Sequence, residues 1–207
     1  GFNPGSTLSG MASTDITIIA TNTLLSAAAG LISSMIYSWM KFGKPDITFT
    51  LNGALAGLVA ITAGADIMSP IGSILTGLIA GVLLVVAVQF FDRVVRIDDP
   101  VGAISVHGVC GAFGTLAVGI FAIEGGVAYG GSLELLISQS IGIGAALLWS
   151  ILIGFTVAYL IKKTIGIRVP EQEELNGLDI EEHSMSAYSE FYIDLPPIDR
   201  IKSNIVS

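Results

Sequence analysis

One histidine lies inside a long apolar segment and is the side chain in this sequence most suited to chemistry within a membrane. The segment is DDPVGAISVHGVCGAFGTLAVGIFA, residues 98–122, and the histidine is His107. An ionisable group within a lipid-spanning helix is costly, so it marks a candidate functional site. Two interpretations follow from the residues alone. His107 either bonds to a carbonyl of a neighbouring helix, or it contacts a proton or substrate in a narrow pore.

The residues around His107 are small, and they do not provide a metal site. On an α-helix the face of His107 also holds Ala103, Gly111 and Gly114, because residues four and seven positions apart share a face. This leaves space for either another helix or a lumen. Cys110 is the one cysteine, and the membrane portion has no second histidine. Since a metal site needs three or four ligands, we predict no metal and no cofactor.

Three further polar or aromatic residues are candidates for function. Phe2 and Ser6 are four residues apart and would share a helix face, although an ordinary helix end with a capping serine explains them equally well. Asn52 is the amide in an apolar segment beside Gly53, and an interhelical hydrogen bond is the simpler interpretation. No nucleophile–base pair and no phosphate-binding loop is evident, so the sequence does not predict an enzyme.

The composition predicts an all-α polytopic membrane protein. Of the 207 residues, 52% are hydrophobic and 13% are charged, whereas a soluble domain has about 25% charged residues. The apolar residues form long runs, as in membrane-spanning helices. The formal net charge is −8, but residues 164–207 contain nine acids and three bases and so supply −6 of it. The acidity therefore belongs to a polar tail, which argues against nucleic-acid binding.

Five membrane spans can be assigned from the apolar runs. We place them near residues 16–40, 48–63, 70–91, 100–122 and 132–160. The second is short for a hydrocarbon core that needs about 20 residues. Glycine pairs four residues apart in the second and third spans would let helices approach closely; they are Gly53 and Gly57, and Gly77 and Gly81. Asp98 and Asp99 precede Pro100, which is typical of a helix start.

The division into regions follows from these spans. Residues 1–15 are expected to hold the end of a truncated helix and an external loop, residues 16–163 the transmembrane domain, and residues 164–207 an acidic cytoplasmic tail. The chain begins GFNPGS without a signal-peptide pattern. So abrupt a start leads us to expect further residues upstream.

The basic residues predict the orientation. All bases of the membrane portion follow the first, third and fifth spans, and they are Lys41, Lys44, Arg93, Arg96, Lys162 and Lys163. The loops after the second and fourth spans hold only Asp66 and Glu124 as charged residues. Under strict alternation all the bases lie on one side, which the positive-inside rule assigns to the cytoplasm. The N-terminal edge is then outside and the acidic tail is cytoplasmic.

Four ordered blocks of the sequence resemble a known family. They are GFNPGS, NGALAGLVAITA, the histidine segment 98–122, and IGIRVPEQEELNGLDIEEHS with AY shortly after. In this order and spacing they resemble the second half of the ammonium transporter (Amt/Rh) family, over about residues 1–190. The resemblance implies an eleven-helix fold in two inverted halves, assembled as a homotrimer with a pore in each subunit. This chain would supply the end of helix six, five complete transmembrane helices and the cytoplasmic tail.

The resemblance also implies roles for individual residues. Phe2 matches one of two stacked phenylalanines that gate the external vestibule, Ser6 a serine that holds ammonium there, and His107 the second of twin pore histidines. Further lumen-lining positions are implied at Asn52, Leu55 and Ala103. These types suit the chemistry, because aromatic faces attract cations, a hydroxyl oxygen accepts an N–H hydrogen bond, and neutral imidazole can take a proton or bond ammonia.

The function implied is passage of ammonium or ammonia across the plasma membrane, for nitrogen uptake. The possible partners are the bilayer, two further copies of the chain, and a P-II signalling protein at the cytoplasmic tail. An ammonium sensor or a docking receptor for such a regulator is the alternative, as is a fragment inactive by itself. The partner histidine and phenylalanine belong to the family's other half. The tail departs from the family pattern, with His183, Ser184 and Met185 where the family commonly has His-Gly-Glu.

Overall fold

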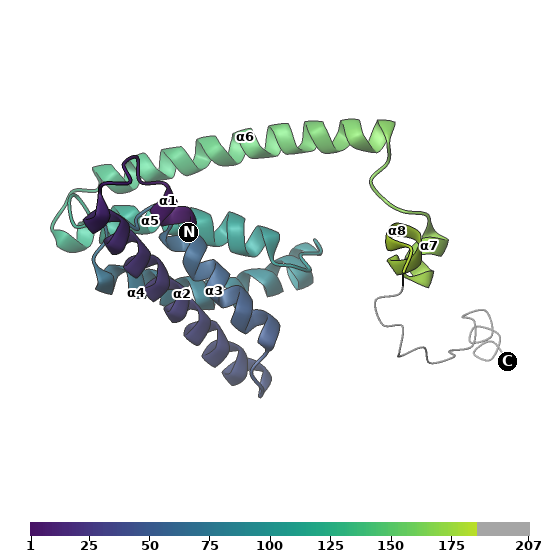
Figure 1. The fold of residues 1–207 in the computed structure, drawn as a ribbon, viewed down its shortest axis with the longest axis horizontal. Helices are drawn as coiled ribbons and strands as arrows, with labels where there is room; N and C mark the ends of the chain where they lie inside the picture. Colours follow the sequence, from purple (N-terminus) through teal and green to yellow (C-terminus); the bar gives the residue numbers. More distant parts are fainter. Residues whose placement is uncertain (186–207) are drawn as a thin grey trace. The chain divides into compact units, whose positions relative to one another are not determined.

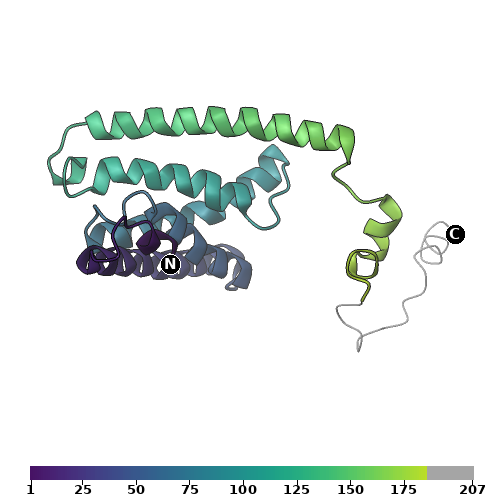
Figure 2. The ribbon, with the colours of Figure 1, turned by 45° about the horizontal axis from the view of Figure 1, so that its top comes forward.

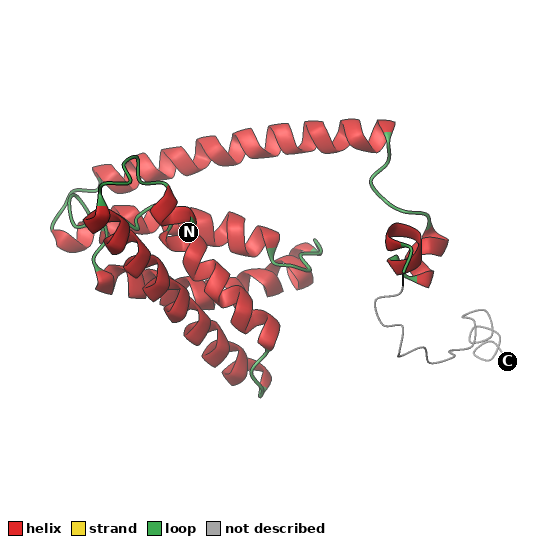
Figure 3. Ribbon diagram, viewed as in Figure 1, coloured by secondary structure: helices red, strands yellow, loops and turns green. Residues whose placement is uncertain are grey.

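The computed structural model describes residues 1–185, and all regular elements in that part of the chain are helices (Figure 3). The first six helices in chain order, with α marking α-helices and η the π- and 3₁₀-helices, are α1 Phe2–Gly5, α2 Ser13–Phe42, α3 Ile47–Ile61, α4 Pro70–Phe90, η1 Phe91–Val95 and η2 Ala103–Val109. The remaining elements are α5 Cys110–Phe121, η3 Val127–Tyr129, α6 Glu134–Thr164, α7 Glu171–Asn176 and α8 Asp179–His183. The chain forms two units, residues 1–150 and 151–207, which are described separately.

The long helices have the length and composition of membrane spans. Within the described residues, four stretches qualify: Ser13–Phe42, Pro70–Val95, Ala103–Phe121 and Glu134–Thr164. Helix α3 is apolar but has 15 residues, which agrees with the short second span expected from the sequence. The prediction of an all-α polytopic membrane fold is confirmed.

Helix α2 packs against both α3 and α4 through glycines (Figure 1). A Cβ added at Gly57 of α3 or at Gly77 of α4 would collide with the carbonyl oxygen of Ser26 on α2. One turn further along, a Cβ at Gly81 would meet the carbonyl oxygen of Gly30. The glycine pairs therefore allow the close backbone contact expected for small residues at membrane helix interfaces.

The core beside this contact is built from small side chains. One buried cluster joins α3, α4, η2 and α5, and consists of Ala56, Ala60, Ala80, Leu84, Val106 and Cys110. The inner face of α2 is polar, yet its buried hydroxyls are satisfied: Ser26 donates to the Gly57 carbonyl at 2.8 Å, and Ser33 donates to the Gly30 carbonyl at 3.2 Å. A hydroxyl bonded to a backbone carbonyl removes the cost of a bare polar group in an apolar interior.

Two loops meet at one end of the first unit. Met68, before α4, forms an isolated antiparallel bridge with Ala122, after α5, and the Ile123 amide donates to the Ile67 carbonyl at 2.9 Å. The hydroxyls of Ser69 and Tyr129 lie 2.7 Å apart. These are the two base-free loops of the sequence, so their contact agrees with their expected position on one side of the membrane.

The histidine segment does not begin as a regular α-helix. Pro100 lies in a turn, Gly102 has a φ of 72°, and the π-helix η2 starts at Ala103. The expected helix start at Pro100 is therefore wrong by three residues. Asp99 does act as a helix-start acid, because its carboxylate accepts hydrogen bonds from the amides of Ile104 and Ser105, each at 3.0 Å.

The second unit contains the C-terminal part of α6 and the two short helices α7 and α8. Arg168 donates to both carboxylate oxygens of Glu174 and holds the start of the tail to α7. Ser184 has a φ of 56°, the left-handed conformation that glycine adopts most easily. The family resemblance noted above implies glycine at this position. The part of the predicted tail, residues 164–207, that follows Met185 lies outside the described residues.

Candidate functional site

An inner cavity brings Phe2 and His107 together. It has a volume of about 670 Å³ and is lined by residues of α1, α2, α3, η2 and α5. Besides Phe2 and His107, the lining includes the apolar Val59 and the hydroxyl-bearing Thr62 and Thr115. Phe2 is 79% exposed, so its ring projects from α1 instead of packing into the protein. Two residues more than 100 positions apart in sequence thus face one space.

His107 has an open imidazole. Its side chain is exposed and makes no hydrogen bond with any described residue, so the described chain contains no carbonyl partner of the kind considered from sequence. The two glycines predicted to share the helix face of His107 have different surroundings. Gly111 lines the cavity with His107, whereas Gly114 packs against α3, because a Cβ there would collide with the carbonyl of Ala60. Gly111 therefore leaves space for the cavity, and Gly114 leaves space for the neighbouring helix α3.

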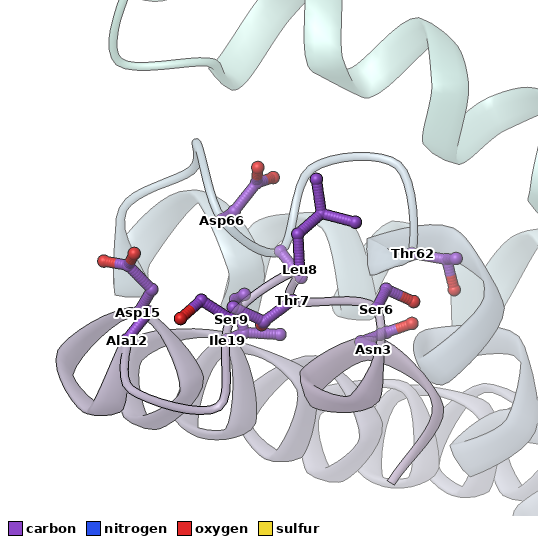
Figure 4. A pocket seen from close by; sticks show the side chains of 11 residues that line it. Asn3, Ser6, Thr7, Leu8, Ser9, Ala12, Asp15, Ile19, Thr62 and Asp66 are labelled. Carbon is purple, nitrogen blue, oxygen red and sulfur yellow. The ribbon is translucent and has the colours of Figure 1, made fainter.

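An outer cavity, also of about 670 Å³, adjoins α1 and the start of α2. Figure 4 shows the carboxylates of Asp15 and Asp66 at one end and the side chains of Asn3, Ser6 and Thr62 at the other. Two carboxylates in a concave surface attract cations and raise their local concentration. The uncharged end adjoins the inner cavity, because Asn3 and Thr62 line both.

Ser6 and Phe2 are held by the short helix α1. The Ser6 hydroxyl donates to the Phe2 carbonyl at 3.0 Å, so its proton is occupied while its oxygen lone pairs remain available to accept. Helix α1 itself is attached to α2, because the Asn3 amide donates to the Thr23 hydroxyl at 3.1 Å (Figures 1 and 2). Ser6 lines the outer cavity and Phe2 the inner one.

The other three positions implied by the family resemblance, Asn52, Leu55 and Ala103, line neither cavity. Asn52 is half-buried and lies near Gly102, since a Cβ on that glycine would be 4.0 Å from the Asn52 amide. It makes no hydrogen bond with a described residue, so the interhelical bond considered from sequence is not formed within this part of the chain. Leu55 and Ala103 are exposed, one helical turn before Val59 and His107 respectively.

Sequence reasoning missed Asn3 and Thr62, the two residues common to both cavities. Asn3 sits inside the GFNPGS block, and its position next to Phe2 was the available signal. Thr62 ends α3 in an otherwise apolar run. No group of three histidine, cysteine or acidic side chains suitable for a metal occurs among the described residues.

Comparison with known proteins shows which family the chain belongs to. The family model described as "Ammonium Transporter Family" matches residues 1–188. The chain belongs to the ammonium transporter family. It is 42% identical over 203 residues to ammonium transporter Amt2 of Archaeoglobus fulgidus, covering 92% of this chain and 43% of that protein. It is 33% identical to an ammonium transporter of Bacillus subtilis, covering 92% of this chain and 48% of the relative.

Solved structures of ammonium transporter family members share the fold. A structure named Sensor Amt Protein superimposes with a TM-score of 0.80 and 36% identity, over 88% of this chain and 45% of that one. The crystal structure of Candida albicans Mep2 gives a TM-score of 0.70 and 28% identity, over 77% of this chain and 38% of the other. The chain spans less than half the length of the relatives described here.

Proposed function

We propose that this chain forms the C-terminal half of a pore through which ammonium or ammonia crosses the membrane. The observation that carries the proposal is that Phe2 and His107 line one cavity in a chain of the ammonium transporter family. A narrow, largely apolar passage disfavours a bare ion, so selectivity depends on the few polar groups that line it.

Each residue has a distinct role in this proposal. The aromatic face of Phe2 attracts a cation as it loses water, and the Ser6 oxygen accepts one of its N–H bonds because the hydroxyl proton is already donated to a carbonyl. The free imidazole of His107 accepts a proton or a hydrogen bond from the solute in transit. No covalent chemistry is required, so the function is not enzymatic.

Three more residues continue this lining in the proposal. Leu55 precedes Val59 by one turn of α3, Ala103 precedes His107 by four residues, and Asn52 lies next to the start of η2. They extend the passage from the inner cavity toward the turn between α2 and α3.

Replacing His107 with alanine tests the proposal. In the natural protein that contains this chain, we expect His107→Ala to abolish the normal ammonium-evoked current of proteoliposomes. The control is Ser140→Ala, on an exposed serine of α6 that bonds only to its own helix and lines neither cavity. An unchanged current in well-folded His107→Ala protein would remove His107 from the conduction path.

The finer assignments of place and assembly belong to the same proposal. We infer a multi-pass protein of the plasma membrane, with residues 1–15 outside and the acidic tail cytoplasmic, because the basic residues follow alternate spans. The family resemblance also supports a homotrimer and a P-II-type regulator at the tail. Crosslinking in native membranes, read as the mass of the crosslinked species, tests the trimer.

A sensor is the second candidate function. It is supported by the similarity to the structure named Sensor Amt Protein. A sensor would bind ammonium at the outer end and pass the signal to a partner at the tail, with little net flux. Ammonium-dependent binding of a cytoplasmic partner, retained in a His107→Ala protein that no longer conducts, would favour this candidate over transport.

A further inference from the structure

Asn22 is a buried amide of α2 that lines neither cavity. Its side chain is 1% exposed and is absent from the lining of both cavities. Its Nδ2 group donates two hydrogen bonds, to the carbonyls of Ala65 and Met68, each at 2.9 Å. Both acceptors belong to the loop between α3 and α4, 43 and 46 positions further along the chain. Asn22 therefore fastens this loop to α2.

The two carbonyl partners settle the orientation of the Asn22 amide. In the opposite orientation Oδ1 would lie against two carbonyl oxygens, so the NH2 group occupies this side. Oδ1 is then enclosed, and it has no hydrogen-bond partner in the described chain. An enclosed oxygen without a partner costs free energy, which an apolar side chain of the same size would avoid. What this amide contributes is thus the pair of bonds that it donates.

The loop that Asn22 holds is also joined to the segment after α5. Met68 forms the isolated antiparallel bridge with Ala122, and the Ile67 carbonyl accepts from the Ile123 amide at 2.9 Å. A buried apolar cluster surrounds these bonds and consists of Ile19, Ile61, Ala65, Met68, Ala117, Val118 and Ala122.

Together these contacts tie α2 to α5, and we call them the loop clasp. The loop clasp comprises the two bonds of Asn22, the bridge between Met68 and Ala122 with its neighbouring backbone bond, and the contact between the hydroxyls of Ser69 and Tyr129, which are 2.7 Å apart. Only the bonds of Asn22 connect it to α2 through a side chain in this set. Loss of these two bonds therefore frees the loop from α2 while it stays joined to the end of α5.

The two helices joined by the loop clasp support different parts of the wall of the inner cavity. Helix α2 holds α1, and with it Phe2, because Thr23 accepts from the Asn3 amide at 3.1 Å. Thr23 is the residue next to Asn22. Helix α5 follows directly on η2, which carries His107. One turn of α2 therefore fastens both the part of the wall with Phe2 and, through the loop clasp, the helix that continues from His107.

We propose that Asn22 is a positioning residue of the pore: by fastening the loop clasp to α2, it fixes the spacing between the wall that carries Phe2 and the wall that carries His107. This inference rests on the proposed function and goes beyond it, because it assigns a role to a residue that touches no solute. A narrow passage discriminates by width as well as by its polar groups. The spacing of its walls therefore affects which cation passes.

Two variants of Asn22 remove its donors and keep its volume. Asn22→Asp preserves the shape of the side chain, but a carboxylate cannot donate, and even a protonated carboxyl donates one bond at most. Asn22→Leu has a similar size and also removes the unpaired oxygen. A third variant, Tyr129→Phe, weakens the loop clasp at its edge, where Tyr129 is 51% exposed and its loss of a hydroxyl leaves the core intact.

Ser38→Ala is the matched control for loss of a buried polar group in α2. Ser38 is fully buried, but its hydroxyl donates only within its own helix, to the Met35 carbonyl at 3.0 Å. It lines neither cavity and belongs to no part of the loop clasp.

The measurement is the ratio of the current evoked by methylammonium to the current evoked by ammonium, in proteoliposomes of the natural protein that contains this chain. Both currents come from the same vesicles, so the ratio does not change when a variant merely yields less folded protein. We expect the ratio to rise about threefold in both Asn22 variants, because walls that are no longer held admit an extra methyl group, whose exclusion from a fitted site is worth about tenfold or more. Tyr129→Phe should give a smaller rise, and Ser38→Ala should match the wild type.

Three outcomes separate the possibilities. A ratio equal to or below that of the wild type in folded Asn22→Asp and Asn22→Leu, whatever their unfolding temperatures, overturns the positioning role, while a silent His107→Ala keeps the proposed function. If neither Asn22 variant folds, Tyr129→Phe decides: a raised ratio supports the loop clasp, and a wild-type ratio overturns it. If the wild type gives no ammonium current, the proposed function fails and this inference fails with it.

Discussion

Asp99 connects the loop before η2 to the helix that carries His107. Its carboxylate accepts from two consecutive backbone amides and, at 2.8 Å, from the Ser105 hydroxyl. These amides belong to the first turn, where helix N–H groups have no partner within the helix. Burial by itself raises the pKa of the Asp99 carboxyl, but the hydrogen bonds from Ile104 and Ser105 favour the ionised form, and the resulting pKa lies below the ordinary 3.8.

Replacing Asp99 with asparagine should destabilise the start of η2. We expect a loss of about 1–2 kcal/mol in the free energy of unfolding, because the NH2 group of asparagine cannot accept the bonds that one carboxylate oxygen accepts and the negative charge is lost. Thermal unfolding in detergent at neutral pH measures the difference. Asp98→Asn is the control, because Asp98 is exposed and its neighbour provides the cap. Equal unfolding temperatures for the two variants would show that the Asp99 bonds contribute little.

The stabilisation by Asp99 should disappear in acid. Because its pKa is lower in the folded protein than the ordinary 3.8, the ionised carboxylate stabilises the fold fully above that ordinary value, and this contribution is lost as the pH falls through the lower, folded value. The difference in unfolding temperature between wild type and Asp99→Asn should therefore be constant from pH 7 to about pH 5 and shrink below about pH 4. A difference that grows on acidification would contradict this assignment.

For single residues, the sequence indicates which side chains are important, but it does not indicate their hydrogen-bond partners. His107 stands out because a histidine is rare in an apolar run, and Asp99 because acids favour helix starts. Asn3 carries no comparable signal, since its importance depends on Thr23, which is twenty positions away and brought close by folding. The sequence also does not show that the Asn52 side chain makes no hydrogen bond with a described residue, because that depends on how far other helices lie from it.

The helix contacts depend on the absence of side chains. Gly57 and Gly77, from two different helices, meet the same residue of α2, Ser26. A methyl group at either position has no space, because the atom it would meet is backbone and cannot rotate away.

Alanine at these glycines should therefore separate the helices. We expect Gly57→Ala and Gly77→Ala to lower the free energy of unfolding by about 1–3 kcal/mol or more, as for overpacked cores. Gly142→Ala in α6 is the matched control: its added Cβ meets nothing within 4 Å, so the change is expected to be neutral or slightly stabilising. Thermal unfolding of the three variants gives the comparison. Similar unfolding temperatures for all three variants would mean that the helices move apart at Ser26 and accommodate the added methyl group at little cost.

The helices themselves were predictable, and the irregular one was not. Apolar runs, bases and prolines locate α2 to α6 within a few residues, and the glycine spacing indicates the close contacts. The π-helical turn of η2 depends on the Gly102 conformation and the Asp99 cap, neither of which has a periodic signature. Since a π-turn changes which later residues share a face, α-helical spacing placed Gly114 beside His107, although it packs against α3.

For the whole molecule, the loop contact agrees with the charge pattern in placing the two base-free loops on one side. The two base-free loops are joined by the bridge between Met68 and Ala122, while the bases follow the opposite ends of the spans. The outer cavity, with Asp15 and Asp66, belongs to the base-free side. If this side is external, as we propose, these two carboxylates raise the local concentration of cations at the entrance of the proposed pore.

Cysteine labelling tests this orientation. The single native cysteine, Cys110, is fully buried, so background labelling is expected to be low. In intact cells, a membrane-impermeant maleimide should label Glu124→Cys and not Lys44→Cys, and permeabilisation should make the second reactive. The reverse pattern would place the basic loops outside and invert the proposed direction of the pore.

The meeting of three backbones at Ser26 has a consequence for how the family can vary. Thr23, which lines the inner cavity, lies one turn from Ser26 on α2, so the distance between the helices at that level is set by main chain against main chain. In the proposed pore, side chains on the cavity wall can then change while the backbone spacing around it stays constant. The solute preference of the proposed pore would then change through single side chains, with the helix packing kept as it is.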